Sequence, residues 1–458
     1  MQQPSSKHAD VIIVGFRCAG ASLAYSLHNA GLKVIVVESA ALYTDHPLST
    51  HVILPLGMQK LDEMGLGDRI RDLAPRQTRL SNRLDDEEIQ LDLSKGELDC
   101  RAPRRSVLDP ALQEAVVEQG VDVREKTKVT GLLRQDERVV GVRVKNANES
   151  YELRADIIVG ADGRHSTVAK LVDAQAYIEA DNYFGTVWSY FSGTCFPQDD
   201  PKYNWDTCFH FHGEKVQLLV KTDSDLMLLG VGAKKDSVSH WVKDSAAGFL
   251  EQLGQGVLSG PLVANSKMVR KPVGITAMTF FMKKAVGPGW ALVGDAGLTA
   301  DPTPGDGITN ALRDVVALSS AIVEGSEQAM LYYWRKRDVD SIALFHAAEY
   351  MGSGSFNNAF NRMTYRYVEK SPAIKQRMIE AVMTRTRPYA DILPMWAAPY
   401  WLLRELIKGN FAPLTAMGDI FSLGGKIMHD ERVLKKALRD LERGSLSADI
   451  PQLSSKEK

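Results

Sequence analysis

The sequence predicts a mixed α/β (α+β) fold in three parts: a doubly wound α/β domain, an antiparallel β-sheet inserted into it, and a helical extension towards the C-terminus. Three observations carry this prediction. A β-branched run at 11–14 leads through a Gly-rich turn and a helical stretch to a second strand. Short, aromatic-rich strands occupy 177–282. After Glu324 almost every segment has helical character, with breaks at Pro and Gly.

Bulk composition narrows the class of protein. Hydrophobic residues make up 44% and charged residues 24% of the 458 residues, which is ordinary for a globular protein of about three domains. A net charge of -2 gives no support to nucleic-acid binding. No apolar run approaches the roughly 18 to 20 residues of a membrane-spanning helix, and no signal peptide is visible. We therefore expect a cytoplasmic protein with four free thiols and, because Cys and His lack metal-ligand spacing, no metal.

The opening β-α-β unit has the pattern of a Rossmann-like dinucleotide-binding domain. The strand at 11–14 is followed by a helix at 21–30 and a strand at 34–37 that ends at Glu38, which comes 18 positions after Gly20. In this arrangement the pyrophosphate lies on the helix N-terminus and the carboxylate accepts hydrogen bonds from ribose hydroxyls.

The turn of this unit departs from the usual fingerprint at one position. Gly15, Cys18 and Gly20 suit a tight turn, but Arg17 stands where a second Gly normally lets the backbone approach the phosphate. The Arg17 guanidinium could bind the pyrophosphate, or the site could be degenerate and empty. The strand–turn–helix–strand context and Glu38 favour a working site.

Two later segments, around residues 51 and 104–105, contain polar residues that are candidates for a functional site. His51 could act as a donor beside a cofactor ring or could be a packed or exposed loop histidine, and we carry it as a candidate catalytic residue. Arg104 and Arg105 begin a helix, where positive charge opposes the dipole, so we expect them to face an anion rather than form a solvated basic turn. Between these loops, 77–98 alternates in hydrophobicity and predicts exposed antiparallel strands outside the nucleotide-binding fold.

Two Asp-containing turns come directly after buried strands. One holds Asp162 and Gly163 ahead of a helix, and the other begins at Gly294 and Asp295. The second continues through a loop rich in Gly and Pro to a helix with Gly307 in its first turn. A carboxylate at a strand tip can bind a polyol hydroxyl, and free N–H groups at the helix start suit an anionic or electron-accepting ligand. The alternative is an ordinary βα loop.

The remaining segments carry weaker signals. The strands of 177–282 predict one wall of a substrate cavity, and His210 and His212 are assigned to the surface of this sheet because no third metal ligand is near. The apolar cluster at 393–403 contains Trp396 and Trp401. It could contact a membrane surface, but we favour packing over the substrate domain.

In this order, the β-α-β unit, the Asp162-Gly163 turn and the Gly294-Asp295 turn with its helix resemble the single-component, group A-like FAD-dependent monooxygenases of the para-hydroxybenzoate hydroxylase fold. The resemblance covers about 9–325. The residues within these motifs are similar to those of a subgroup of FAD-dependent oxidoreductases. This subgroup is intermediate between the aromatic hydroxylases, the flavin halogenases and the geranylgeranyl reductases.

The resemblance implies FAD as cofactor, NAD(P)H as co-substrate and a set of binding residues. Glu38 would bind the adenosine ribose, and Val129 would meet adenine through its backbone. Asp295 would bind the ribityl hydroxyls, while Gly307 and Ile308 would present N–H groups to the flavin pyrimidine ring. The full set of implied cofactor residues is Gly15, Arg17, Cys18, Gly20, Glu38, Arg105, Val129, Asp162, Gly163, Asp295, Gly307 and Ile308.

The implied chemistry is hydroxylation or epoxidation, with O₂ and a C4a-hydroperoxyflavin, of an aromatic, polyketide-like or terpenoid small molecule. Reduction of isoprenoid double bonds is the main alternative, faintly suggested by Tyr203-Asn204-Trp205. A flavin halogenase ranks lower because its Trp-x-Trp-x-Ile-Pro signature is missing from the sequence. A redox-silent binding protein is the last alternative, given Arg17. Leu298 instead of the common His, and Asp301 before Pro302, depart from the hydroxylase pattern.

These interpretations define the expected organisation. The FAD-binding domain comprises 1–75, 101–174 and 286–325, and the substrate domain comprises 76–100 and 175–285. A helical region at 326–445 precedes a disordered tail at 446–458. Expected partners are a small organic substrate and O₂, with no nucleic acid and at most weak contact with a membrane surface, in a monomer or homodimer.

Overall fold

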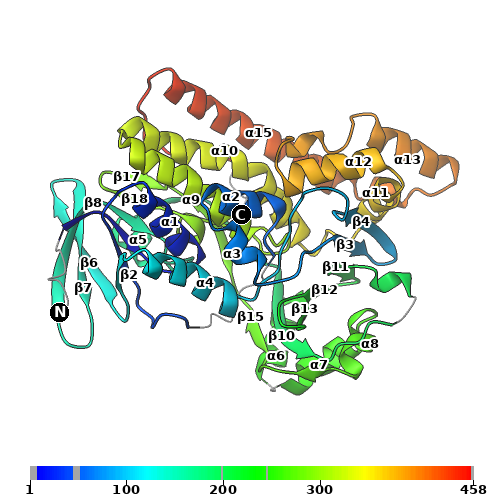
Figure 1. The fold of residues 1–458 in the computed structure, drawn as a ribbon. Helices are drawn as coiled ribbons and strands as arrows, with labels where there is room; N and C mark the ends of the chain where they lie inside the picture. The colour runs from blue at the N-terminus through cyan, green and yellow to red at the C-terminus, as the bar shows by residue number, and fades with distance from the viewer. Residues whose placement is uncertain (1–7, 45–51, 198–199, 244–245, 455–458) are drawn as a thin grey trace.

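The computed structural model describes residues 8–44, 52–197, 200–243 and 246–454, so His51 lies outside the described residues. Within them, the predicted fold class is confirmed. Figure 1 shows an α/β domain at the N-terminal end of the chain, an antiparallel sheet beside it, and a layer of C-terminal helices above both. One expectation is corrected here: His210, assigned to the surface of the antiparallel sheet, lies on that sheet but is buried, with a ring nitrogen 3.1 Å from the Asp85 carbonyl oxygen.

The α/β domain is built on five parallel strands in the order β18-β8-β1-β2-β5. β17 extends one edge, and the antiparallel hairpin β6–β7 pairs with the first half of β8. Val, Ile and Ala fill both faces of β1, as expected for a parallel strand covered on two sides. The strands are β1 (His8–Val14), β2 (Val34–Val37), β5 (Asp122–Arg124), β6 (Lys128–Gln135), β7 (Arg138–Lys145), β8 (Ser150–Gly160), β17 (Val286–Gly287) and β18 (Trp290–Leu292).

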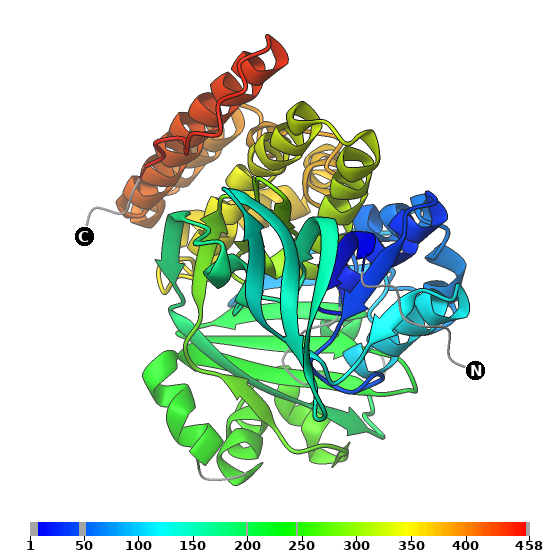
Figure 2. The same cartoon turned by 90° about the vertical axis from the view of Figure 1, so that its left-hand side faces the viewer.

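Helices cover this sheet and bring its loops to one edge. α1 packs against α4 and α9, and α2 packs on α9, so the hydrophobic core on this face includes Leu23, Leu112 and Leu312. The helices of this domain are α1 (Cys18–Asn29), α2 (Pro55–Glu63), α3 (Gly67–Arg71), α4 (Arg105–Glu118), α5 (Thr167–Leu171) and α9 (Gly307–Glu324). In Figure 2, where the left-hand side of Figure 1 faces the viewer, the β6–β7 hairpin lies in front of the parallel strands.

The second sheet has the order β14-β10-β13-β12-β11-β3-β4, with β15 also paired to β10. Its strands are β3 (Arg79–Leu84), β4 (Glu87–Asp92), β10 (Phe184–Ser192), β11 (Thr207–His212), β12 (Lys215–Lys221), β13 (Met227–Lys234), β14 (Lys267–Met268) and β15 (Val273–Ile275). Helices α6 (Lys235–Lys243), α7 (Ala246–Gly254) and α8 (Ser259–Ala264) lie at its outer side. A small sheet of β9 (Ala176–Asp181), β16 (Thr279–Lys283) and β19 (Leu298–Thr299) connects the two domains.

One sequence-based expectation about this sheet needs correction. β3 and β4 do lie outside the parallel sheet, but their apolar side is not exposed, since Leu84 and Ile89 are buried. Helix α11 (Ala359–Glu369) packs on β4 and covers that side. Alternating hydrophobicity shows that a strand has one buried face, and the covering helix comes from a region that carried no pairing signal.

The C-terminal region is helical, as predicted. α10 (Glu327–Met351) and α15 (Met417–Glu442) pack along each other, and Figure 2 shows α15 at the outer surface. α12 (Pro372–Met378), α13 (Ala397–Ile407) and α14 (Ala412–Thr415) lie over the second sheet with α11. Of the predicted tail, Ser454 donates its backbone N–H to Asp430 at 2.7 Å, a contact that the polar composition did not suggest. No helix within the described ranges has the length and apolarity needed to cross a membrane.

Candidate functional site

One cavity of about 530 Å³ lies where the strand tips of the α/β domain face the second sheet. It is bordered by Glu38, Asp162 and Asp295, which come from three separate segments of the chain. Of the twelve residues that the sequence singled out for cofactor binding, eleven line this cavity. They are Gly15, Arg17, Cys18, Glu38, Arg105, Val129, Asp162, Gly163, Asp295, Gly307 and Ile308.

Gly20 is the exception, and its place explains why. A Cβ at Gly20 would stand 1.9 Å from the Gly15 carbonyl oxygen, so Gly20 allows α1 to pack against its own turn. Gly15 has a φ of +100°, and a Cβ there would stand 2.5 Å from the Ala161 carbonyl oxygen. Both glycines therefore permit close backbone packing at the β1–α1 turn.

The start of α1 presents positive potential to the cavity. Arg17 is the N-cap residue, no side chain caps the helix, and no acidic residue stands in its first turn. The first N–H groups of a helix have no partner within it, and the dipole adds positive potential there. Arg17 and the α1 N-terminus together suit an anionic group.

Glu38 ties the tip of β2 to the same turn. Its Oε2 accepts a hydrogen bond from the Phe16 N–H at 2.8 Å, and its Oε1 accepts one from the Ala40 N–H at 2.8 Å. An ionised carboxylate has about four acceptor positions, so it can still accept hydrogen bonds from a diol. Glu38 is thus both a structural acceptor and part of the cavity wall.

The two arginines at the start of α4 face different anions. Arg104 pairs with Asp223 of the second domain, with an Nη2–Oδ1 distance of 2.6 Å. Arg105 lines the cavity and forms a bidentate ion pair with the buried Asp109, with Nε–Oδ1 and Nη2–Oδ2 distances of 2.9 and 2.8 Å. Close by, burial raises the pKa of the Cys18 thiol to about 12, so this thiol is neutral. The solvated basic turn considered from the sequence is not found.

Asp162 has a local structural role in addition to lining the cavity. Its Oδ2 accepts from the Thr167 N–H at 2.6 Å and its Oδ1 from the Ser166 hydroxyl at 2.5 Å, which fixes the start of α5. Gly163 next to it has a φ of +76° and nothing within 4 Å of a Cβ position. This turn therefore leaves open space at the cavity.

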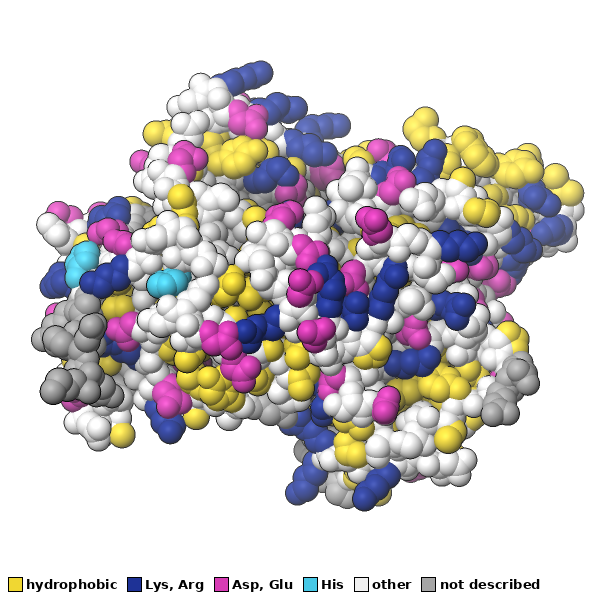
Figure 3. Space-filling model, viewed as in Figure 1, with side chains coloured by type: hydrophobic (Ala, Val, Ile, Leu, Met, Phe, Trp, Pro, Cys, Tyr) yellow, Lys and Arg dark blue, Asp and Glu magenta, His cyan; other side chains and the backbone are white. Residues whose placement is uncertain are grey.

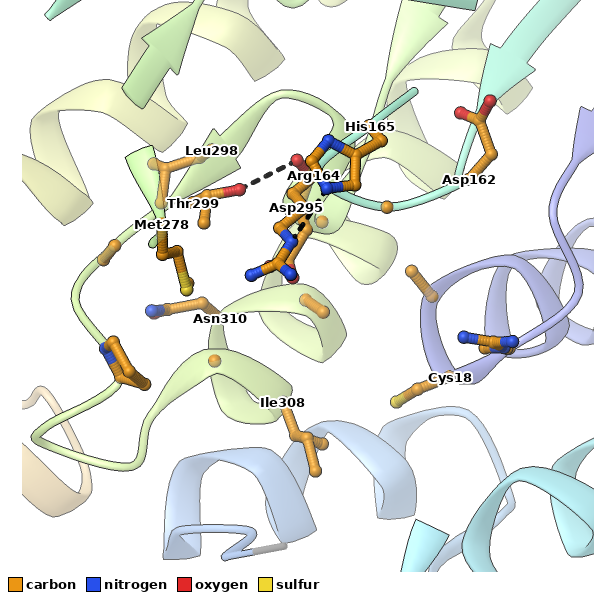
Figure 4. A pocket seen from close by; sticks show the side chains of 18 of the residues that line it. Cys18, Asp162, Arg164, His165, Met278, Asp295, Leu298, Thr299, Ile308 and Asn310 are labelled. Atoms are coloured by element: carbon orange, nitrogen blue, oxygen red, sulfur yellow. Dashed lines mark hydrogen bonds between the residues drawn. The ribbon is translucent and has the colours of Figure 1, made fainter. Parts of the chain in front are cut away.

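Arg164 and His165 of the same turn also line the cavity, although sequence reasoning gave them no role. Figure 4 shows both side chains in the centre of the view beside Asp295, and Arg164 Nε lies 3.3 Å from His165 Nε2. Burial, followed by the charges of Arg164, Lys170 and Lys283, lowers the pKa of His165. Their position directly after Asp162-Gly163 is the signal that could have identified them.

Asp295 opens into the middle of the cavity. Its side chain is exposed to the cavity, but the surrounding cavity wall desolvates the carboxylate and raises its pKa, while Arg105 and Arg164 oppose the shift. In Figure 4 Asp295 lies between the Cys18 side and the Met278 side of the cavity. A carboxylate here can accept hydrogen bonds from the hydroxyls of a ligand that spans both sides.

The start of α9 is an uncapped helix N-terminus facing the cavity. Asp306 is the N-cap residue, a position where Asp normally accepts from a first-turn N–H, but it makes no such bond. Its carboxylate instead pairs with Arg385 at 3.1 Å. Nothing lies within 4 Å of a Cβ position at Gly307. The free N–H groups of this turn are therefore available to a ligand in the cavity.

Asp301 is a further cavity residue that sequence reasoning left without a role. Its Oδ1 accepts from the Thr303 N–H at 2.9 Å and from the Thr303 hydroxyl at 2.5 Å. Burial raises its pKa to about 6. A Cβ at Gly352 would stand 2.0 Å from Asp301 Oδ2, so the C-cap residue of α10 leaves room for this carboxyl group.

The two halves of the cavity differ in charge. Its basic residues, Arg17, Arg105, Lys128 and Arg164, all belong to the α/β domain. In the described part of the chain, the lining residues of the second and third sheets and their loops include no Lys, Arg or His. On the strands and the loops next to them they are Asn182, Phe184, Thr186, Trp188, Phe209, Val216, Leu218, Ile275, Met278, Phe280, Leu298 and Thr299. One half suits an anionic ligand and the other an uncharged, largely apolar one. Among the described residues no group of three or more His, Cys, Asp or Glu could hold a metal ion.

Comparison with known proteins agrees with this geometry. Residues 8–223 match a family described as the FAD binding domain. The chain is 26% identical over 312 residues to digeranylgeranylglycerophospholipid reductase of Methanosarcina acetivorans, covering 66% of this chain and 72% of that protein. It is 24% identical over 401 residues to 6-methylpretetramide 4-monooxygenase of Streptomyces rimosus, covering 84% and 91%. The solved structure of flavin-dependent brominase Bmp2 superposes with a TM-score of 0.67 at 18% identity, covering 88% of this chain and 98% of that one.

Proposed function

Because this chain carries an FAD-binding domain and is an FAD-dependent oxidoreductase, as its motifs predicted, we propose that it is a monooxygenase acting on an uncharged, largely apolar small molecule. The observation that carries this proposal is the division of one cavity into a basic half and an aromatic half whose described residues carry no positive charge. NAD(P)H is the proposed electron donor, and an aromatic, polyketide-like or terpenoid compound is the proposed substrate.

The residues of the basic half fit FAD. Uncapped N-termini of α1 and α9 suit the pyrophosphate and the electron-accepting ring, and Asp295 between them suits the ribityl hydroxyls. Glu38 would hold the adenosine ribose, and Arg105 would hold the phosphates or the ribityl chain. When bound, FAD supplies the redox chemistry and the activation of O₂.

The protein's own contribution is positioning, exclusion of water and control of a proton. Trp188, Phe209 and Phe280 would pack on a flat or extended apolar substrate and keep bulk water out. Asp301 borders the same space, and a carboxyl group with a pKa of about 6 can hold or release a proton near neutral pH. We assign that proton to Asp301 Oδ2, because Oδ1 already accepts two hydrogen bonds from Thr303.

The proposal is tested with the FAD-loaded enzyme. NADH or NADPH oxidation and O₂ consumption should rise together when a neutral phenol or terpenoid is added. They should respond far less to the corresponding carboxylate, since none of the described residues of the aromatic half is a cation. Oxygen uptake that no organic compound stimulates would count against monooxygenation. A colourless protein that takes up no FAD would support the redox-silent alternative.

Reduction of isoprenoid double bonds is a second candidate, which the apolar cavity and the similarity to digeranylgeranylglycerophospholipid reductases both favour. A reaction under anaerobic conditions distinguishes the reductase activity from the monooxygenase activity. A reductase consumes its substrate with reduced flavin in the absence of O₂, whereas a monooxygenase forms no product until O₂ is admitted.

A further inference from the structure

Helix α13 (Ala397–Ile407) has large apolar side chains on both of its faces, but the described residues cover only one face. Ala397, Trp401 and Leu402 are buried, and the Trp401 ring stacks on Tyr367 with centroids 5.3 Å apart. This inner face packs on α11, which in turn packs on β4 of the second sheet. A helix that is apolar all round normally has both faces covered.

The outer face of α13 continues into a contiguous set of exposed apolar residues, here called the α13 patch. Trp396, Tyr400, Leu403 and Ile407 follow helical spacing, and Ile407 is 77% exposed. Large residues on the flanking segments extend the set. The α13 patch consists of Met395, Trp396, Tyr400, Leu403, Ile407 and Phe411. Figure 3 shows hydrophobic side chains gathered over α13, with Lys and Arg beside them. Patches of this kind mark interaction surfaces.

Cationic side chains lie beside the α13 patch. Arg404 lies within the patch, over the rings of Tyr367 and Tyr400, and Lys408 follows it. Glu405 is buried, and its carboxylate accepts hydrogen bonds from the Tyr367 hydroxyl, the Asn410 amide and Lys408 Nζ at 3.0, 2.7 and 2.8 Å. Lys408 is therefore paired, while Arg404 lies over aromatic rings. The helices from Ala359 to Glu442 carry fourteen Lys and Arg against nine Asp and Glu, a net charge of +5, whereas the rest of the chain carries -7.

We propose that the α13 patch docks on the surface of an anionic lipid membrane. Trp and Tyr have an apolar ring and a polar tip that suit the headgroup level, Ile and Leu can enter the acyl boundary, and neighbouring Arg and Lys attract anionic lipid. A second copy of this chain is a poorer occupant. A two-fold dimer would place each patch against itself and bring Arg404 and Lys408 close to the same cations of the other copy.

The test is sedimentation of the FAD-loaded enzyme with vesicles. We expect binding to phosphatidylcholine vesicles that contain about 30 mol% phosphatidylserine, and much weaker binding to pure phosphatidylcholine. Trp396→Asp combined with Ile407→Asp should lower binding at least about tenfold, and Arg404→Glu should lower it about fivefold to tenfold. Val257→Asp is the matched control, because Val257 is 52% exposed and precedes α8, which lies towards the bottom of Figure 1 while α13 lies towards the top.

Three results would overturn the proposal. They are no sedimentation with anionic vesicles, equal binding to neutral and anionic vesicles, and an equal loss of binding in Val257→Asp. A wild-type dimer that Trp396→Asp with Ile407→Asp converts to a monomer in sedimentation velocity would assign the patch to a second copy instead. Retention of bound FAD by each variant shows that the fold is intact, and this readout is independent of the chemistry proposed above.

Discussion

Asp301→Asn should stabilise the protein at neutral and alkaline pH, because the ionised carboxyl group opposes folding. The Asp301 residue is only 6% exposed. Burial is the main cause of its raised pKa, the two hydrogen bonds from Thr303 oppose it, and the nearby charges of Glu349 and Asp306 add to it. The amide of Asn keeps an acceptor for Thr303 but carries no charge to bury.

The magnitude follows from the shift of this pKa from 3.8 to about 6. The folded protein then binds more protons than the unfolded chain between these values, so wild-type stability falls as pH rises through this window and stays low above it. The raised pKa of Asp301 therefore lowers the free energy of unfolding of the wild type by about 1.5 kcal/mol at pH 5 and by about 3 kcal/mol at pH 8. Weaker hydrogen bonds from Thr303 to a neutral acceptor offset about 1 kcal/mol at either pH. The advantage of the variant should therefore grow by about 1.5 kcal/mol from pH 5 to pH 8.

Urea unfolding of both proteins at pH 5, 6, 7 and 8, with and without FAD, measures this difference. Asp156→Asn is the control, since Asp156 is exposed on β8. A difference between Asp301→Asn and wild type that does not change with pH would refute the reasoning. The same variant tests the proposed proton: turnover by wild type should show an inflection near pH 6 that Asp301→Asn lacks.

Three further substitutions probe the basic half of the cavity. Asp295→Ala should weaken FAD binding about tenfold to a hundredfold, as expected when a carboxylate acceptor is lost; titration of FAD fluorescence measures this, and unchanged affinity would contradict the assignment. Arg17→Gly should change FAD affinity more than Arg443→Gly, a substitution at an exposed helix end, and equal effects would separate Arg17 from the pyrophosphate. Asp109→Ala leaves the Arg105 guanidinium without its two-pronged partner and should lower the free energy of unfolding by about 3 to 5 kcal/mol in urea, whereas a loss below about 1 kcal/mol would mean that Arg105 finds another anion.

Much of this arrangement was predictable because it rests on local rules. Continuous β-branched runs mark buried parallel strands, and residues after the carboxyl ends of such strands meet at one sheet edge. This is why Glu38, Asp162 and Asp295, which are far apart in the sequence, could be expected at one site, and why they border one cavity. The glycines of the first turn follow from the same geometry, since close backbone approach requires them.

Residues whose surroundings depend on distant segments were not predictable in this way. Arg104 was expected to face an anion, but its partner Asp223 lies 119 residues away on another domain. For Asp301, the sequence showed only that its place before Pro302 departs from the hydroxylase pattern. Its raised pKa comes from burial, and α10, with Gly352 next to its carboxyl group, helps to enclose it. No periodicity in the sequence indicates which carboxyl group will be enclosed.

The start of α9 shows how a distant residue can change the meaning of a local motif. By local rules, Asp306 should cap α9 and use up an N–H that a ligand needs. Arg385, from the helical extension, prevents this: it adopts a left-handed backbone conformation, with a φ of 54°, and holds the Asp306 carboxylate at 3.1 Å. Such a conformation costs free energy in a non-glycine residue and persists only where surrounding contacts impose it. The C-terminal extension, which carries no cofactor motif, thus decides whether the helix N-terminus at the cavity is free to bind.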